Sequence, residues 1–431
     1  MDLTPWLTQA GQWALVLVLL ALALVGFLHL TRGTAIRHVR GTSADTRPIA
    51  PDEPTFPLGV AILTGATLMT GNRVEVALNG DTYERLWEDL RSATESITLQ
   101  LYYGQRGQLK STLRQILVDR VAAGVRVYVL HDAFGFSGMP REDRAALEAA
   151  GVVVIPFRPL NLSALHLVQH RSHVRGIVID GRIGWTGGFG IDDKWLGDGR
   201  TDGSWRETNV RFEGPAVRQL QAAFVAAWAE ATGILLTPRV TLTSADGETV
   251  KAGLLHTYPT MGATTAERFL ALSIAGARKS ISITNAYFVP DDNFVGLLAD
   301  ASRRGVDVRI LTGGARTDVP IVRFAGRARY EELLDAGVRI YEWLPTVLHS
   351  KTFVVDGVWS TIGSKNFDNR SLALNDEATL MILDDGFGRQ MEEIFVDDLR
   401  HAEEIRLPPF RRRAYFERLA EDTCSVVARL L

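Results

Sequence analysis

The first strong pattern along the chain is an uninterrupted apolar run close to its beginning. Residues 13–28 read WALVLVLLALALVGFL and contain no charged side chain. With the uncharged residues on either side, the run over residues 11–30 reaches the roughly 20 residues that an α-helix needs to cross the hydrocarbon core of a bilayer. The pattern therefore predicts one N-terminal transmembrane helix.

The charges around this run indicate how such a helix would be oriented. Asp2 is the one charged side chain before it, whereas three arginines follow it, Arg32, Arg37 and Arg40. A cleaved signal peptide would have a basic beginning and a cleavage site of small residues, so an uncleaved anchor is favoured. By the positive-inside rule, the rest of the chain is expected on the cytoplasmic side of the cell inner membrane. An export signal and a helix that lies on the membrane are the alternatives.

Beyond the apolar run the pattern changes twice. Residues 31–57 show no apolar periodicity and include four prolines, which predicts a juxtamembrane linker. After the linker, runs typical of β-strands alternate with amphipathic helices. Strands are expected at 96–103, 124–130 and 152–157, and helices at 109–123 and 141–151.

The second half of the chain repeats this order. Strands are expected at 280–288, 306–312 and 338–343, and helices at 293–305 and 330–337. Strands joined by crossover helices predict α/β layers with largely parallel strands. We therefore expect two related halves at 58–250 and 251–400, followed by a C-terminal basic and amphipathic tail at 401–431.

The last part of this tail has two interpretations. Residues 410–431 combine a basic triplet with an apolar helical face. Such a helix can rest on anionic lipid. A solvated helix packed on the preceding domain is the favoured interpretation.

Composition narrows the classes of function. The 431 residues are 46% hydrophobic and 23% charged, which is ordinary for a globular protein with a large core. The net charge of −3 argues against a dedicated nucleic-acid binder. Cys424 is the single cysteine, so an intramolecular disulfide and a cysteine-based zinc site are excluded.

Two matching sets of polar residues interrupt the apolar strand patterns. Each half contains a histidine, a cation two residues later and an aspartate seven residues after the histidine. The sets are His173, Arg175 and Asp180 in the first half, and His349, Lys351 and Asp356 in the second. Because positions i and i+2 of a strand share a face, each histidine should lie beside its cation.

A histidine beside a cation suits chemistry on a phosphate. The cation stabilises charge on the non-bridging oxygens, and the imidazole attacks phosphorus or transfers a proton. Two such pairs would supply a nucleophile and a separate acid without a metal or another cofactor. Taken singly, a histidine on a strand is most often structural, and an Asp-Gly pair after a strand is most often a turn. The occurrence of both sets at the end of the same predicted βαβ unit favours the catalytic interpretation.

This constellation resembles the signature of the phospholipase D superfamily, in which H-x-K-x4-D occurs twice and is followed by GSxN. Residues 363–366 read GSKN and match that extension. Further segments are similar to bacterial cardiolipin synthases, namely 72–90, 195–228, 283–292 and 334–343. The resemblance spans about residues 60–400. It implies an α/β fold of two phospholipase D-like α/β/α sandwich halves with pseudo-twofold symmetry and both histidines in one cleft.

The resemblance also implies roles for the histidines. A phosphohistidine intermediate is expected, with His173 as nucleophile and His349 as general acid and base. Each histidine should be held by a carboxylate on its other ring nitrogen, which fixes the tautomer. Glu377, 28 residues after His349, stands where the family places such a residue, and Glu207 is its counterpart for His173.

The remaining motif residues are assigned to the phosphate or to structure. Ser364 and Asn366 are expected to bind the substrate phosphate together with the cations Arg175 and Lys351. The two motif aspartates belong to the signature, and each is expected to stabilise the turn after its strand.

The first motif departs from the family pattern. Arg175 stands where a lysine is usual, and Gly190 stands where the second copy has Asn366. Arginine keeps the charge and can bind phosphate through two N–H groups, but its rigid fork changes the geometry. The site is thus expected to be fully active, slower, or altered in substrate preference. The sequence contains no Walker-A loop, no G-x-G-x-x-G and no HExxH, so no cofactor and no metal are expected.

The leading function is therefore a membrane-anchored phosphatidyltransferase that makes cardiolipin from two molecules of phosphatidylglycerol. Its expected partners are a phospholipid substrate and the membrane, without nucleic acid. Hydrolysis at the same site, giving phosphatidic acid, is the nearest alternative, and a nuclease is less favoured. A non-catalytic lipid-binding protein with a degenerate first motif is an alternative of a different class.

Overall fold

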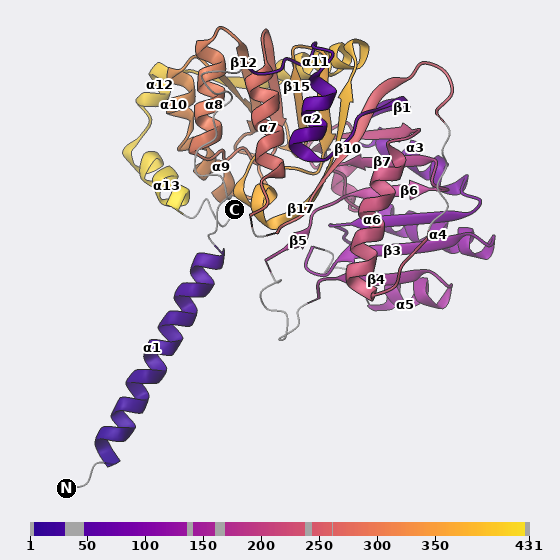
Figure 1. Ribbon diagram of the computed structural model, residues 1–431, viewed down its shortest axis with the longest axis horizontal. Coiled ribbons are helices and arrows are strands. Elements are labelled where there is room, and N and C mark those ends of the chain that lie inside the picture. Colours follow the sequence, from indigo (N-terminus) through magenta and orange to yellow (C-terminus); the bar gives the residue numbers. More distant parts are fainter. Residues whose placement is uncertain are drawn as a thin grey trace.

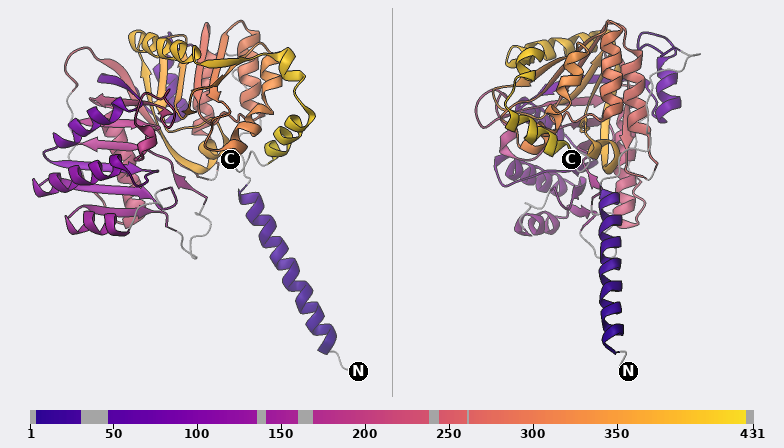
Figure 2. Two further views of the ribbon diagram at one scale, coloured as in Figure 1. Left: turned by 180° about the vertical axis from the view of Figure 1, so that it is seen from behind. Right: turned by 90° about the vertical axis from the view of Figure 1, so that its left-hand side faces the viewer.

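The computed structural model describes residues 4–30, 47–135, 141–159, 169–237, 244–260 and 262–426. The N-terminal helix α1 (Thr4–Leu30) projects away from the rest of the chain (Figures 1 and 2). The described side chains at positions 12–24 of α1 are all exposed. Within the described part of the chain, no helix is both long enough and apolar enough to cross a membrane. Most of the predicted linker, residues 31–46, and the last residues of the tail, 427–431, lie outside the described residues.

The two halves contribute to one mixed sheet (Figure 1). The first half supplies β1 (Met69–Leu78), β2 (Ser96–Leu101), β3 (Arg126–Asp132), β4 (Val153–Phe157), β6 (Gly176–Ile179), β7 (Ile183–Gly187) and β9 (Thr208–Glu213). The second half supplies β10 (Val250–Thr257), β11 (Ser280–Asn285), β12 (Asp307–Gly313), β13 (Arg339–Trp343), β15 (Lys351–Val355), β16 (Trp359–Gly363), β17 (Asn375–Leu383) and β18 (Ala402–Ile405).

The strand order displays the duplication. From the antiparallel β1–β10 pair, the first half runs outward as β9-β7-β6-β2-β3-β4 and the second as β17-β16-β15-β11-β12-β13, with β18 added at the edge. Each strand of the first half thus has a counterpart at the same distance from the junction. The strands expected from the sequence are all present, with ends that differ by a few residues.

The expectation of largely parallel strands is wrong. Only β2-β3-β4 and β11-β12-β13 pair in parallel along the main order, and the other neighbours pair antiparallel. The turns at Asp180–Gly181 and Asp356–Gly357 explain this. Three residues separate β6 from β7, and three separate β15 from β16. Such short connections join antiparallel strands, because a parallel pair needs a crossover of a dozen residues or more.

Helices cover both faces of each half. In the first half these are α3 (Asp81–Arg91), α4 (Gln108–Ala122), α5 (Arg141–Ala149) and α6 (Val217–Thr232). In the second half they are α7 (Thr265–Gly276), α8 (Asp292–Arg303), α9 (Pro320–Arg327), α10 (Tyr330–Asp335) and α11 (Asp385–Leu399). Successive residues of a strand point to opposite faces. Accordingly, Ile177 packs with α3 and α4 and Val178 with α6, while Phe353 packs with α7 and α8 and Val354 with α11.

One hydrophobic cluster extends across the junction of the halves. It joins Val217 and Leu220 of α6 to Leu254 of β10, and reaches Phe387 and Met391 of α11. Residues on both sides of the predicted boundary at 250 therefore share a core.

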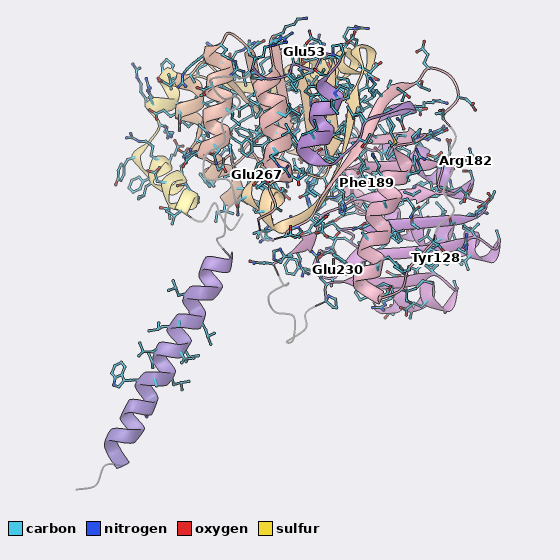
Figure 3. The ribbon with its side chains drawn as sticks, viewed as in Figure 1. Glu53, Tyr128, Arg182, Phe189, Glu230 and Glu267 are labelled. Carbon is cyan, nitrogen blue, oxygen red and sulfur yellow. The ribbon has the colours of Figure 1, made fainter. Side chains whose placement is uncertain are left out.

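The end of the predicted linker is packed rather than solvated. Phe56 begins α2 (Phe56–Thr64), is fully buried, and meets the Trp359 ring edge-on at 5.0 Å between centroids. Glu53, labelled in Figure 3, pairs with Arg47 and Arg278. The core around Phe56 belongs to the second half, so residues 58–64 pack with that half instead of the first. The apolar run after the last proline of the linker is the physical reason.

The C-terminal residues are likewise part of the second half. β18 extends its sheet by pairing with β13, and α12 (Leu407–Arg411) and α13 (Tyr415–Val426) follow. In α13, Glu421 is fully buried and accepts hydrogen bonds from Arg327 and Arg413. α13 is thus attached to the second half through Glu421 and Cys424. Its Tyr415, Phe416 and Val426 side chains are exposed, so contact of this helix with lipid stays a prediction.

We expect Phe56→Ala to lower the free energy of unfolding by about 3–5 kcal/mol, because a large buried ring would leave a cavity against Trp359. Leu58→Ala in the same helix is the matched control, since that side chain is 60% exposed. Its effect should stay within about 0.5 kcal/mol. Chemical denaturation of the full chain measures both, and equal effects would contradict the packing described here.

Candidate active site

Two short parallel ladders bring the histidines to the junction of the halves. β5 (Arg171–Ser172) pairs with the start of β17, and β14 (Val347–Leu348) pairs with β8 (Trp205–Arg206). Directly after these strands, the backbone N–H of His173 donates to the carbonyl of Asp376 at 2.9 Å, and that of His349 to the carbonyl of Arg206 at 2.8 Å. Each histidine is therefore fixed to a strand of the other half.

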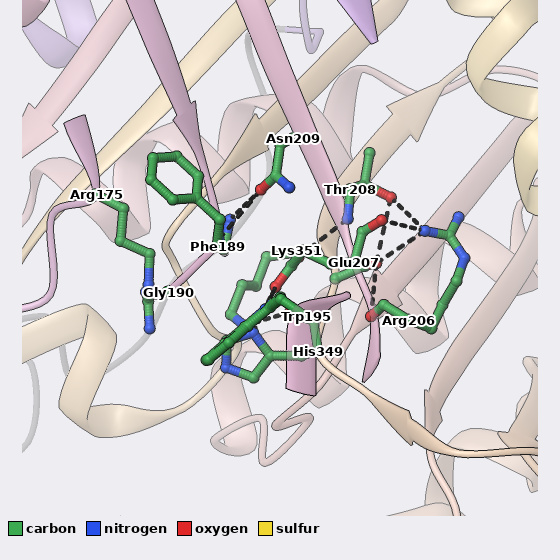
Figure 4. A network of polar contacts seen from close by, with 12 residues as sticks. Arg175, Phe189, Gly190, Trp195, Arg206, Glu207, Thr208, Asn209, His349 and Lys351 are labelled. Carbon is green, nitrogen blue, oxygen red and sulfur yellow. Dashed lines mark hydrogen bonds and ion pairs between the residues drawn. The ribbon is translucent and has the colours of Figure 1, made fainter. Parts of the chain in front are cut away.

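The carboxylate partners are crossed between the halves. Nδ1 of His173 lies 3.0 and 3.1 Å from the two carboxylate oxygens of Glu377. Nδ1 of His349 lies 2.6 Å from Glu207, and Figure 4 shows these two residues. The sequence assigned Glu207 to His173 and Glu377 to His349, and this pairing is wrong. Each glutamate directly follows the residue whose carbonyl binds the opposite histidine, so the ladders determine the exchange.

The two cations contact their histidines differently. Nη1 of Arg175 donates to Nε2 of His173 at 3.1 Å, so that nitrogen carries the lone pair and Nδ1 carries the proton toward Glu377. Nζ of Lys351 instead lies 2.9 Å from Nδ1 of His349 and also donates to the carbonyl of His349. Nε2 of His349 has no hydrogen bond to another described residue.

Burial dominates the electrostatics of this cluster. It lowers the pKa of His173 to about 4, with help from Arg175 and against Glu377. Burial, then Lys351 and Arg175, hold the pKa of His349 well below its ordinary value. Burial also lowers the pKa of Lys351 to about 7. Both imidazoles are therefore neutral at pH 7.

The two glutamates differ in their preferred charge. Burial would raise the pKa of Glu377, but His173, Lys365 and Ser364 together lower it to about 2. Burial raises the pKa of Glu207 above its ordinary value, although Lys351 and a hydrogen bond from Trp195 oppose the shift. Glu377 is thus deprotonated at neutral pH, whereas Glu207 binds a proton more readily than an ordinary glutamate.

A cavity of about 320 Å³ opens onto the histidines. Of the predicted site residues, His173, Arg175, His349 and Asn366 line it. Oδ1 of Asn366 is buried and has no hydrogen-bond partner in the described structure. This amide oxygen can therefore accept a hydrogen bond from a hydroxyl or N–H group of a ligand.

Two residues expected at the phosphate lie elsewhere. Ser364 donates to Glu377 and accepts from the backbone N–H of Ala378 at 3.0 Å, so it positions a carboxylate rather than facing the cavity. Lys351 is buried behind His349 and does not line the cavity.

The motif aspartates are structural. Asp180 accepts from the backbone N–H groups of Thr94, Glu95 and Ser96 at 2.8–2.9 Å. Asp356 accepts in the same way from residues 278–280 at 2.7–2.9 Å. Both aspartates have a left-handed backbone, with φ of 52° and 55°, at the hairpin turns. This agrees with the sequence argument for a turn, and removes both from the set that contacts a substrate.

Aromatic side chains complete the cavity, and the motif analysis did not include them. The Tyr102 ring meets His173 edge-on at 4.8 Å, and the Tyr287 ring meets His349 at 6.4 Å. Trp195 and Trp205 lie 5.5 and 5.2 Å from the His349 ring. The tyrosines follow equivalent strands, β2 and β11, so the repeated strand ends were a signal for them. The tryptophans lie between Gly190 and Glu207, and the equivalent stretch from Asn366 to Glu377 contains no tryptophan.

The missing asparagine of the first motif is explained by Trp195. A Cβ atom at Gly190 would lie 2.7 Å from two ring atoms of Trp195. Both residues are labelled in Figure 4. The indole fills the space beside Gly190, and its Nε1–H donates to Glu207 at 3.2 Å. A side chain at position 190 would therefore displace the group that supports the Glu207–His349 pair.

We expect Gly190→Ala to lower the free energy of unfolding by about 1–3 kcal/mol, because Trp195 must move to admit a methyl group. Gly296→Ala is the matched control, since nothing lies within 4 Å of its added Cβ in α8. There the helix should gain up to about 1 kcal/mol. Thermal unfolding with tryptophan fluorescence measures both, and a neutral Gly190→Ala would contradict this packing.

The chain is similar to known cardiolipin synthases over most of its length. The family model described as cardiolipin synthase, PLD-like domain, matches residues 270–399. A cardiolipin synthase of Halalkalibacterium halodurans is 35% identical, over 81% of this chain and 70% of that protein. One from a Geobacillus species is 36% identical, over 83% of this chain and 72% of that protein.

Solved structures share the fold at low identity. A phosphatidylserine synthase of Haemophilus influenzae superposes with a TM-score of 0.61 at 13% identity, covering 87% of this chain and 98% of that one. A polyphosphate kinase of Porphyromonas gingivalis gives 0.52 at 14% identity, covering 85% and 52%. By sequence and fold together, the chain belongs to the cardiolipin synthase family of phospholipase D-like enzymes.

Proposed function

We propose that this protein is a membrane-anchored phosphatidyltransferase that joins two molecules of phosphatidylglycerol into cardiolipin and releases glycerol. The observation that carries the proposal is the pair of crossed His–Glu contacts beside one cavity lined by Arg175 and Asn366. The names of the relatives favour the same reaction. A phosphodiester in this cavity would have a histidine on either side.

In the first step, Nε2 of His173 attacks phosphorus. The bond from phosphorus to this nitrogen forms, and the bond to the glycerol oxygen breaks. The neutral His349 gives its Nε2 proton to the leaving alcohol while its Nδ1 takes a proton from Glu207, so that the imidazole stays neutral. The anionic Glu377 supports His173 in this role, because the phosphorylated imidazole carries a positive charge. Glu207 beside His349 retains a proton more readily, which suits proton transfer.

In the second step, the terminal hydroxyl of the acceptor lipid attacks the phosphohistidine. His349 takes the proton of that hydroxyl at Nε2 and returns its Nδ1 proton to Glu207. The new phosphate ester forms, and His173 leaves with its lone pair restored. Water in place of the acceptor would give phosphatidic acid by the same path. Transfer and hydrolysis therefore differ only in which hydroxyl reaches His349.

In this mechanism Arg175 changes its hydrogen-bond partner from His173 to the substrate phosphate. In the resting site its guanidinium donates to Nε2 of His173, the nitrogen that attacks. Phosphate oxygens are stronger acceptors for arginine than a neutral imidazole. Binding of the phosphodiester is therefore expected to draw Arg175 to the phosphate and expose the lone pair of His173.

We also propose that residues 11–30 anchor the protein in the inner membrane. α1 is one continuous helix, and its described side chains are exposed rather than packed on the domain. The arginines that follow it favour a cytoplasmic catalytic part. Such an anchor would keep the cavity near its lipid substrates.

The test is an assay of the purified, detergent-solubilised protein with labelled phosphatidylglycerol. Cardiolipin and glycerol should form, and the rate should fall by about 1000-fold or more in His173→Ala and in His349→Ala. His401→Ala, which alters a histidine packed on Trp343 outside the cavity, is the matched control and should keep the rate. Phosphatidic acid alone would establish the hydrolase instead. Activity that appears only in Arg175→Lys would establish a degenerate first motif and sink the transferase proposal.

We expect the acid limb of kcat/KM to lie well below pH 6.5, close to the pKa of about 4 that burial and Arg175 impose on His173. The sign follows because the attacking lone pair is lost when pH falls through that pKa. Arg175→Gln removes a positive neighbour, so the pKa of His173 should rise and the limb should move toward neutral pH. A profile measured over the folded range checks this, and a wild-type limb at pH 6.5 would contradict it.

A further inference from the structure

Besides Arg175, two further cations of the described structure line the cavity, namely Arg370, which donates to the carbonyl of Gln169 at 3.3 Å, and Lys194. Lys194 belongs to a short 3-10 turn (Asp193–Trp195). Its ammonium lies over three rings, 4.0 Å from the centroid of Tyr103, 4.8 Å from Trp195 and 3.8 Å from Trp205. All four side chains line the cavity. The rings hold the charge in position through cation–π attraction.

This ammonium is positioned by the rings and by a long ion pair with Asp192, but it donates no hydrogen bond within the described structure. Its nearest carboxylate oxygen, on Asp192, lies 3.8 Å away, beyond hydrogen-bond distance. No acceptor in the described structure takes a hydrogen bond from its Nζ, although the group has three N–H donors. The side chain is 22% exposed, on the cavity side of the aromatic cage. These properties suit an anionic group that enters with a substrate.

The position of Lys194 connects it to one of the two histidines. Trp195 and Trp205, which hold its ammonium, are also the rings that pack on His349. Trp195 also donates a hydrogen bond to Glu207, whose carboxylate pairs with Nδ1 of His349. The cation therefore belongs to the His349 side of the cavity, where the acceptor hydroxyl gives up its proton in the proposed mechanism.

We propose that Lys194 binds the phosphate of the acceptor lipid and so determines the choice of acceptor. This inference rests on the proposed transferase function and deepens it. An acceptor phosphatidylglycerol carries its own phosphate, one three-carbon unit from the attacking hydroxyl. The phosphate that is transferred lies at His173 and Arg175, so a second phosphate needs a second cation. Water and simple alcohols lack this group and gain nothing from Lys194.

The experiment compares two acceptors in one reaction. The full-length protein in detergent receives phosphatidylglycerol labelled in its phosphatidyl part together with ethanol, and cardiolipin and phosphatidylethanol are separated and counted. In Lys194→Met, which keeps the length of the side chain but removes its charge, the ratio of cardiolipin to phosphatidylethanol should fall at least about tenfold. Lys194→Arg should keep the ratio within about threefold of wild type, because guanidinium also stacks on aromatic rings and binds phosphate.

A surface lysine provides the matched control. Lys279→Met removes the same charge from an exposed position and should leave both the ratio and the total rate unchanged. Thermal unfolding of each variant shows whether it is folded, and Lys194→Gln replaces Lys194→Met if the latter unfolds.

The outcomes separate the two levels of proposal. A selective fall in the ratio supports the acceptor site. A wild-type ratio in Lys194→Met, or an equal fall in both products, overturns it while leaving the transferase intact. If the wild-type protein forms neither product, the proposed function fails, and the acceptor site fails with it.

Discussion

The exchange of strands between the halves is the constraint on which the site depends. β5 binds β17, and β14 binds β8, so each histidine is hydrogen-bonded to backbone of the opposite half. Glu377 and Glu207 come with those strands. Neither half by itself contains a histidine together with its carboxylate. The two halves therefore form a single catalytic unit. They also share one hydrophobic core under the junction, so we expect them to fold as one unit.

Burial makes this arrangement both costly and useful. Charged groups removed from water are tolerated only when they are paired, and removing one partner of a buried pair typically costs about 3–5 kcal/mol. Ser364 and Ser371 donate to Glu377, while Trp195 and the backbone of Thr208 donate to Glu207. The two carboxylates occupy equivalent places but have different donors. The pKa difference between them has a further cause, because His173 and Lys365 lower the pKa of Glu377 more than its hydroxyl donors do, whereas burial dominates at Glu207.

Much of the fold and part of the site could be predicted from the sequence. Apolar periodicity located the paired strands and helices, and the spacing from histidine to cation placed Arg175 and Lys351 beside their histidines. Separation along the sequence did not predict which residues lie close together in the fold. Glu377 is close to His349 along the chain but lies against His173, because a strand exchange leaves no local signal. Ser364 carries a motif position yet faces a carboxylate, and Phe56 packs with the second half because its partner Trp359 is some three hundred residues away.

The continuous sheet limits how lipid substrates can enter the cavity and how products can leave it. Backbone pairing between β1 and β10 joins the halves at the centre, and the two exchanged ladders join them again at the cavity. A clamshell motion about a hinge would have to break these hydrogen bonds and open the common core. Substrate exchange is thus expected through a standing entrance in a rigid frame, with side-chain rearrangements such as that of Arg175 acting in place of domain closure.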